Sequence, residues 1–314
     1  MKILCIGEAL IDMICTNTGS TLSEGQDFLK KPGGAPTNVA AAIGALGGTV
    51  TLSAKVGNDP FGEQLISTMR SFGVDTDGVI KDKDYFTTFA FVSLLSDGER
   101  DFVFNRGADG QLSIDDLQSL EVNSYSIIHF GSATAFLPGP LQKAYLWLLE
   151  TAIANNIFIS FDPNYRHLLF PEGTASFIEQ SWHFLNHCNF FKVSDEEAML
   201  ITNTNSIGQA VEYLSQKTTA VFAITLGKQG TMLVIDKQKI IVDSIPVLSV
   251  DSTGAGDAFV GAVLYQLSIL ENFKDLNADD WKKIIYNANK AGGRTCEYHG
   301  AMEAFQHLSS AIFD

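Results

Sequence analysis

The stretch Asp-Ser-Thr-Gly-Ala-Gly-Asp-Ala-Phe, residues 251–259, is the part of this chain around which the rest is interpreted. Residues 239–247 before it are extended and strand-like. Residues 258–267 after it are apolar on every side, as in a buried helix. The stretch is therefore a glycine-rich turn at a helix N-terminus. Free N–H groups and the helix dipole make such a turn a suitable place for a phosphoryl group in transfer.

Asp257 lies just past the glycines, where its carboxylate can accept the proton of an attacking hydroxyl. The amides of Gly254, Ala255 and Gly256 would form an anion hole for the phosphoryl group. A loose phosphoryl transfer removes the proton late, so the depressed pKa usual at a helix N-terminus would suffice for this base. A glycine turn with an acidic cap is common by itself. The chain holds no P-loop, no GxGxxG after a first strand and no GxSxG elbow.

The composition fits a globular protein with one large core, with 46% of the 314 residues hydrophobic. The formal net charge of −15 argues against nucleic acid and anionic membranes as partners, because both select basic patches. The sequence has no run of about 18 apolar residues, and its N-terminal apolar run is too short for a signal peptide. We therefore expect a cytoplasmic protein with four free thiols, at Cys5, Cys15, Cys188 and Cys296.

The order of the expected elements predicts the fold class. Residues 126–132 and 157–162 are strand-like, and residues 141–155 between them are helical in pattern. This alternation predicts an α/β fold with a doubly wound, mostly parallel sheet flanked by helices. Residues 86–106 alternate as β-strands around Ser-Asp-Gly-Glu at 96–99, which predicts a hairpin.

Polar residues follow several of these strands. Asp12, at the end of the first strand, is either a turn cap or an acceptor for the hydroxyls of a polyol. The paired glycines Gly33 and Gly34 enter an alanine-rich helix whose first turn carries Asn38, which is either a plain cap or a ligand site. The carboxyl ends of parallel strands bind ligands in open α/β sheets. Three further candidates lie at such an end: Asp162, Asn164 and Arg166.

The string at 251–259 resembles the ATP-site signature of the ribokinase (PfkB) family of sugar kinases, D-T-x-G-A-G-D-x-F, with Ser252 in place of the usual threonine. Gly-Gly-Ala-Pro-Thr-Asn at 33–38 is similar to that family's G-G-x-x-x-N-x-A. Val-Gly-Asn-Asp-Pro-Phe-Gly at 56–62 is similar to its V-G-x-D-x-F-G, and Thr-Leu-Gly-Lys-Gln-Gly at 225–230 to its nucleotide-contacting turn. The landmarks occur in family order along essentially the whole chain.

The resemblance implies a single ribokinase-like α/β domain over residues 1–314. It also implies a small β-sheet lid over the sugar site, formed by the inserted segments 13–31 and 86–106. Two copies of the chain could form a homodimer through this lid, and the resemblance does not decide this point. Arg106 closes the hairpin and resembles a family position, although a surface salt bridge is its other interpretation.

The resemblance further implies an ATP-dependent kinase with Asp257 as base and Mg²⁺ on the ATP phosphates. Asp12, Gly33, Gly34 and Asn38 would hold the sugar, with Asp162 and Asn164 nearby and Arg106 and Arg166 as edge contacts. The implied ATP-binding residues are Lys192, Ser194, Thr225, Gly227, Gly230, Gly254, Gly256 and Asn289.

Metal roles also follow from the resemblance. Glu197 in Ser-Asp-Glu-Glu at 194–197 would act on Mg²⁺ through water. Asp251 and Thr253, together with the loop His-Gly-Ala-Met at 299–302, would hold a monovalent cation such as K⁺. Glu303 and Ala304 replace the family's proline and small polar residue after this loop. Whether this chain binds the monovalent cation is therefore left undecided by the sequence.

D-fructose, phosphorylated at its 6-hydroxyl, is the expected substrate. Three segments resemble fructokinases more than ribokinases or adenosine kinases: residues 33–38, 105–109 and 162–166. The alternatives are 2-keto-3-deoxygluconate, whose kinases share D-P-N-x-R, and ribose. An alternative of another class is a non-catalytic sugar sensor on the same fold, which would have no need of Asp257.

Overall fold

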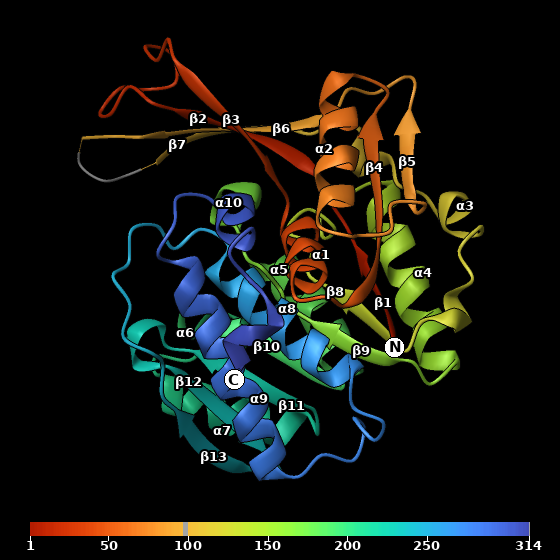
Figure 1. Ribbon diagram of the computed structural model, residues 1–314, viewed down its shortest axis with the longest axis vertical. Helices are drawn as coiled ribbons and strands as arrows, with labels where there is room; N and C mark the ends of the chain where they lie inside the picture. The colour runs from red at the N-terminus through yellow and green to blue at the C-terminus, as the bar shows by residue number, and fades with distance from the viewer. Residues whose placement is uncertain (97–99, 314) are drawn as a thin grey trace.

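A nine-stranded sheet forms the middle of the molecule, in the order β13-β12-β11-β10-β9-β8-β1-β4-β5 (Figure 1). This computed structural model describes residues 1–96 and 100–313. Neighbouring strands pair in parallel from β5 to β11, while β12 pairs antiparallel with both β11 and β13. The strands are β1 (Lys2–Ile6), β4 (Thr49–Gly57), β5 (Val79–Asp82), β8 (Ile127–Phe130), β9 (Phe158–Phe161), β10 (Phe190–Ser194), β11 (Val221–Thr225), β12 (Thr231–Ile235) and β13 (Gln238–Val242).

Helices cover both faces of this sheet, because its central strands are apolar on both sides. In β1, Ile3 and Cys5 enter one core layer, whereas Leu4 and Ile6 enter the other. The first layer holds α1 (Ala35–Ala45), α2 (Pro60–Ser71), α8 (Ala255–Ser268), α9 (Ala278–Thr295) and α10 (Ala301–Phe305). The second holds α3 (Ile114–Leu117), α4 (Pro140–Ala154), α5 (Ala175–Leu185), α6 (Asp195–Thr202) and α7 (Ile207–Lys217). The doubly wound, mostly parallel sheet that we predicted is confirmed.

A second, four-stranded sheet extends from one end of the molecule, above α1 and α10 in Figure 1. Its order is β3-β2-β6-β7, with β2 parallel to β6 and the two outer pairs antiparallel. Its strands are β2 (Leu10–Cys15), β3 (Phe28–Gly33), β6 (Thr88–Leu94) and β7 (Arg100–Asn105). Both segments that we predicted for the small sheet, 13–31 and 86–106, therefore contribute to it. The expected hairpin turn at 96–99 lies largely outside the described residues.

One predicted strand is shorter than expected. The strand expected over residues 239–247 ends at Val242, and the chain continues without regular structure to the glycine turn. Pro246 has no N–H to donate to a neighbouring strand, which favours this irregular path. The segment thus leads out of the sheet before α8 begins.

Small residues bring α1 and α8 together. A side chain at Gly261 would meet the Cβ of Ala42 at 2.7 Å, so the two helices can pack this closely only with glycine at 261. Their N-termini lie at the same end of the molecule, below the small sheet. The two glycine-rich turns of the sequence are therefore neighbours in space.

Candidate active site

The first turns of α1 and α8 are joined by a direct hydrogen bond. The Nδ2 of Asn38 donates to the Oδ2 of Asp257 at 2.8 Å, although 219 residues separate them. Asn38 is buried, and its Oδ1 has no partner among the described residues. An unpaired buried acceptor costs free energy, so the site has a place for a donor such as a sugar hydroxyl. The predicted base and the predicted sugar ligand are thus parts of one site.

The glycine turn of α8 has the geometry that phosphate binding requires. Gly254 is the N-cap with φ of 79°, a left-handed conformation that favours glycine, and no side chain caps the helix. A Cβ at Gly254 would also collide with Ala301 of α10. The N–H of Ala255 donates to the carbonyl of Ser252 at 3.2 Å. Of the three amides predicted for the anion hole, that of Ala255 is therefore already used within the turn.

Asp257 differs from a typical helix cap in its ionisation. Burial raises its pKa, while the hydrogen bond from Asn38 and the positive charges of Arg166 and Lys192 act in the opposite direction. The pKa of Asp257 is thus raised rather than depressed as is usual at a helix N-terminus, because desolvation outweighs the hydrogen bond and the neighbouring charges. A raised pKa makes Asp257 a stronger proton acceptor once it is ionised.

Lys192 lies directly beneath the glycine turn. It comes from β10, and its Nζ would be 3.3 Å from a Cβ on Gly256. The same Nζ donates to Asp162 Oδ2 at 3.0 Å, and both side chains are buried. Burial alone lowers the pKa of Lys192, but the carboxylates of Asp162, Glu197 and Asp257 raise it overall. A charged lysine is thus held close to the turn.

Asp162 and Asn164 support this arrangement from the loop after β9. Burial raises the pKa of Asp162 to about 6, so it is ionised at neutral pH. Asn164 has a left-handed φ of 49°; its N–H donates to Asp162 Oδ1 at 3.1 Å and its Nδ2 to the carbonyl of Gly131 at 3.1 Å. Both side chains therefore support Lys192 and the loop, and their contacts with the sugar stay predictions.

Asp12 and Arg166 face the same space from opposite sides. Burial raises the pKa of Asp12 to about 7; the charge of Arg166 lowers it and the carboxylate of Glu8 raises it. Gly33 lies against the Asp12 carboxylate, where a side chain would collide. Gly34 has φ of 103° and fits closely against the Glu8 carbonyl. The exposed Arg166 also acts on Asp257, so Asp12, Asp257 and Arg166 belong to one electrostatic group.

Arg106 makes contacts with three residues of the protein. Its guanidinium donates to the carbonyls of Pro138 and Thr134 at 3.0 and 3.1 Å, and its Nε lies 3.6 Å from Asp109. These contacts join the end of the small sheet to the loop after β8. These contacts agree with the ion-pair interpretation of Arg106, and its edge contact with the sugar stays a prediction.

Both carboxylate oxygens of Glu197 form hydrogen bonds within the protein. Its two carboxylate oxygens accept the N–H groups of Tyr165 and Ser194, each at 2.8 Å, and Ser194 caps α6 in return. Among the described residues, no group of three or more His, Cys, Asp or Glu side chains is placed to hold a metal ion. The water-mediated contact of Glu197 with Mg²⁺ stays a prediction.

On the nucleotide side, the turn after β11 brings Thr225, Gly227 and Gly230 together, with positive φ at both glycines. Asn289, by contrast, is used internally. Its Nδ2 donates to the carbonyls of Val242 and Asp243, and its Oδ1 accepts from Thr231 at 2.6 Å. Asn289 thus fixes α9 against β12 and β13, and its contact with the nucleotide stays a prediction.

The loops predicted for a monovalent cation touch each other. Asp251 accepts from the N–H and Oγ1 of Thr253 at 3.0 and 2.7 Å, and from the N–H of Gly300 at 2.8 Å. Although burial alone would raise it, these hydrogen bonds hold the pKa of Asp251 below its usual range. The Asp251 side chain therefore connects the loops, and any cation would rely on backbone carbonyls.

Sequence reasoning missed Glu8, which is fully buried. It accepts from Ser132 Oγ at 2.5 Å, from Ala35 N–H at 3.1 Å and from Ala133 N–H at 3.3 Å. Burial raises its pKa. It joins the glycine pair at 33–34 to the loop after β8. A lone acidic residue at the end of an apolar strand was the available signal.

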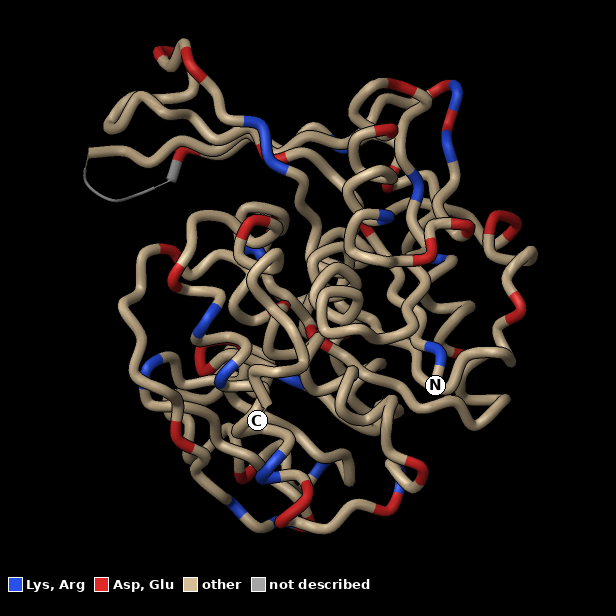
Figure 2. The backbone as a smooth tube through the Cα atoms, in the orientation of Figure 1, with Lys and Arg blue, Asp and Glu red and all other residues tan. Residues whose placement is uncertain are grey.

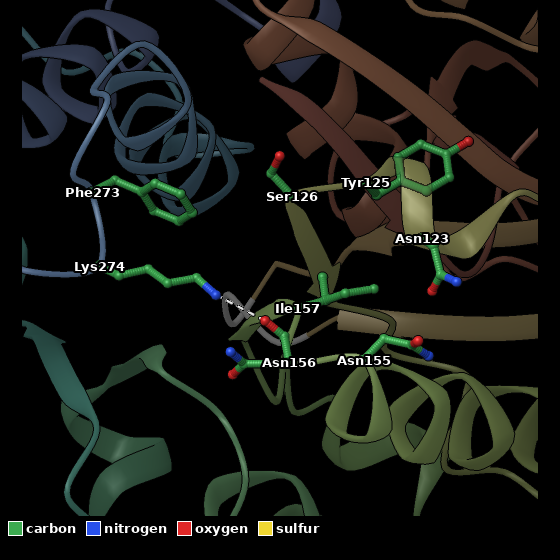
Figure 3. Close-up of a pocket in the computed structure, with 8 residues that line it drawn as sticks. All are labelled: Asn123, Tyr125, Ser126, Asn155, Asn156, Ile157, Phe273 and Lys274. Atoms are coloured by element: carbon green, nitrogen blue, oxygen red, sulfur yellow. Dashed lines mark hydrogen bonds between the residues drawn. The ribbon is translucent and has the colours of Figure 1, made fainter.

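A hollow elsewhere in the molecule is separate from this site. It lies at the amino ends of β8 and β9, and Figure 3 shows Lys274 reaching the Asn156 carbonyl at 2.8 Å there. The residues discussed above follow the carboxyl ends of the strands. In Figure 2, acidic and basic residues are distributed along the described part of the chain. No helix in the described ranges has the length and apolarity to cross a membrane.

The uncapped glycine turn with Asp257 beside it lies at the carboxyl edge of a doubly wound sheet, and comparison with known proteins identifies the class as ATP-dependent sugar kinases. The chain belongs to the pfkB family of carbohydrate kinases, whose family model matches residues 1–308.

Curated and solved relatives agree with this. The chain is 37% identical to fructokinase-1 of Zea mays over 309 residues, covering 96% of this chain and 93% of the relative. A double mutant of the fructokinase of Vibrio cholerae O395, solved with fructose, ADP and potassium ion, is similar with a TM-score of 0.86 at 27% identity, covering 99% and 96% of the two chains. A fructokinase of Xylella fastidiosa with bound ATP gives 0.87 at 28% identity, with the same coverage.

Proposed function

We propose that this protein is a fructokinase, which transfers the γ-phosphate of ATP to the 6-hydroxyl of D-fructose. The observation that carries the proposal is the Asn38–Asp257 hydrogen bond, because it joins the proposed proton acceptor and the proposed sugar ligand beside the uncapped turn. The fructose and ADP named for the Vibrio cholerae structure support the choice of substrates.

In the proposed reaction, the 6-hydroxyl oxygen of fructose attacks the γ-phosphorus while Asp257 takes its proton. The bond from the γ-phosphorus to the bridging oxygen breaks, and its electron pair leaves with ADP. The free first-turn amides and Lys192 stabilise the charge on the phosphoryl oxygens. Mg²⁺ on the ATP phosphates would neutralise further charge there. The raised pKa of Asp257 is useful because its carboxylate ends the step protonated.

The charges around the site favour a neutral sugar over a sugar acid. Asp12 and Asp257 supply two acidic groups to the proposed sugar site, and the carboxylate of Glu8 acts on Asp12 from behind it. Arg166 is the cation that acts on both Asp12 and Asp257. A substrate carboxylate would meet like charges, which is unfavourable. This argues for fructose over 2-keto-3-deoxygluconate.

Replacing Arg166 by alanine tests this choice. With a sugar acid as substrate, loss of a charge-assisted pair is expected to cost about 1.5–3 kcal/mol, roughly 10–150-fold in kcat/KM. With fructose we expect a smaller loss that does not depend on salt. The measurement compares kcat/KM for fructose, ribose and 2-keto-3-deoxygluconate in the wild type and the variant. A clear wild-type preference for the acid would reject fructose.

The ionisation of Asp12 predicts a pH dependence. A carboxylate grips two hydroxyls only when it is ionised, and the pKa of Asp12 is raised to about 7. We therefore expect kcat/KM for the sugar to rise with pH through about 7 and then level off. The Asp12→Asn variant should lose the rise of kcat/KM near pH 7. Any rise of kcat/KM with pH that remains in this variant is then due to ionisation of Asp257. An unchanged profile in Asp12→Asn would contradict the role of Asp12.

The small sheet is proposed as a lid and as a dimer contact. Register pairing puts Ile14, Leu29 and Leu94 on the same face as Asp12, and all three are at least 39% exposed. Phe102 and Phe104 stack on this face with ring centroids 6.3 Å apart. An apolar sheet face of this kind fits the same face of a second copy. Sedimentation should give twice 34.1 kDa for the wild type and a shift to monomer for Leu29→Glu; a wild-type monomer would contradict the dimer.

Two further parts of the proposal concern the ion and the compartment. A monovalent cation bound by carbonyls of the loops around Asp251 and Gly300 is supported by the potassium ion named for the Vibrio cholerae structure. All four cysteines are free, which supports a reducing compartment such as the cytoplasm.

A further inference from the structure

One ion pair connects the small sheet to the catalytic half of the chain. Lys31 on β3 donates through Nζ to Glu303 Oε1 on α10, across 272 residues of sequence. Among the residues that the structure describes, no other hydrogen bond runs from within β2, β3, β6 or β7 to a residue after 130. Arg106, just after β7, bonds to Thr134 and Pro138 on the other side of the sheet's end, away from α10 in the sequence. Lys31 lies directly opposite Asp12 in the β2–β3 register, so both side chains are on the face above the site. The pair therefore acts beside the proposed sugar contact.

Glu303 is in turn next to the phosphate-binding turn. A Cβ on Gly300 would meet the Glu303 Oε2 at 2.5 Å and the Lys31 Nζ at 3.6 Å, so the ion pair lies directly over Gly300. The N–H of Gly300 donates to Asp251, and the following residue, Ala301, packs against Gly254. A short path of contacts thus leads from β3 to the N-cap of α8. The second carboxylate oxygen of Glu303 has no partner among the described residues, although the Glu303 side chain as a whole is 41% exposed. Lys31 is thus the cation that faces this carboxylate.

We propose that Lys31 and Glu303 form a latch that positions the lid relative to the phosphate-binding turn. The proposal rests on the proposed sugar-kinase function, and it assigns a positioning role to two residues outside the binding machinery. When the latch is closed, Asp12 on the lid and Gly254 at the start of α8 are held in a fixed relation, so the sugar hydroxyl and the phosphoryl group meet at the required distance. Breaking the latch lets the lid move independently of the turn.

Kinetics of single and paired variants test the latch. Lys31→Met and Glu303→Gln should each lower kcat/KM for fructose about 3- to 10-fold by raising KM and lowering kcat together, with KM for ATP changed less than about 2-fold. The exchanged pair Lys31→Glu with Glu303→Lys should recover activity to within about 2-fold of the wild type, since the ion pair re-forms with reversed charges.

Lys30→Met is the matched control, because Lys30 is the adjacent residue on β3 and lies over the ring of Phe61, on the other face. It should keep the wild-type kinetics. The latch is rejected when Lys31→Met behaves like Lys30→Met, or when the exchanged pair is no better than the single variants.

Hydrogen exchange without any sugar separates a failure of the latch from a failure of the proposed function. Lys31→Met should speed exchange in residues 296–305, far from the substitution in sequence, and Glu303→Gln should do so in residues 28–33. Lys30→Met should change neither segment. Unchanged exchange in both latch variants overturns the latch, whereas a wild type that phosphorylates no sugar overturns the function alone.

Discussion

Replacing Asp257 by asparagine is expected to lower kcat about 10²–10⁴-fold and to leave ATP affinity nearly unchanged. Asparagine keeps the size of the side chain and can still bond to Asn38, but it cannot accept the proton of the sugar hydroxyl. The first-turn amides and Lys192, which we propose to hold the phosphate, are untouched. The measurement is steady-state kinetics with saturating ATP, together with ATP binding by calorimetry.

Asp279→Asn provides the control for this substitution. Asp279 is an exposed aspartate in the first turn of α9, so the change removes the same charge from an equivalent helix position away from the site. It should keep wild-type kcat. An Asp257→Asn variant with more than half of the wild-type kcat would show that another group takes the proton.

Replacing Asp162 by alanine is expected to destabilise the fold by about 3–5 kcal/mol, because Lys192 is then left buried without its partner. Urea unfolding at neutral pH measures the change. The double variant Asp162→Ala with Lys192→Met should recover much of the loss, since it buries no charge at either position. A loss below about 1 kcal/mol in Asp162→Ala would show that water compensates Lys192.

Local patterns in the sequence predicted the fold well. The apolar run at 258–267 and the alternation of strands and helices depend on neighbouring residues, and both patterns match α8 and the central sheet. The strand predicted over residues 239–247 was too long, because the prediction followed the apolar residues of this segment and gave too little weight to Pro246, and β13 ends at Val242. The glycine turn was recognised because phosphate binding depends on a short, contiguous backbone segment.

The individual roles of site residues were harder to predict, because they depend on contacts between distant segments. Asn289 and Arg106 have the residue types expected of ligands, yet the carbonyls of β13 and of the loop after β8 occupy their donors. The raised pKa of Asp257 arises from burial, which a helix-cap pattern does not reveal. The Lys31–Glu303 pair could not be predicted for the same reason, since no local sequence pattern indicates a contact between residues so far apart in the chain.

The central claim is that a sugar hydroxyl is phosphorylated beside Asp257. The most direct measurement is ³¹P NMR of the purified protein with ATP, Mg²⁺ and fructose, in parallel with Asp257→Asn. We expect the wild type to form ADP and fructose 6-phosphate in equal amounts, and the variant to form neither at a comparable rate. Release of inorganic phosphate without a sugar phosphate, or equal rates in the two proteins, would contradict the account.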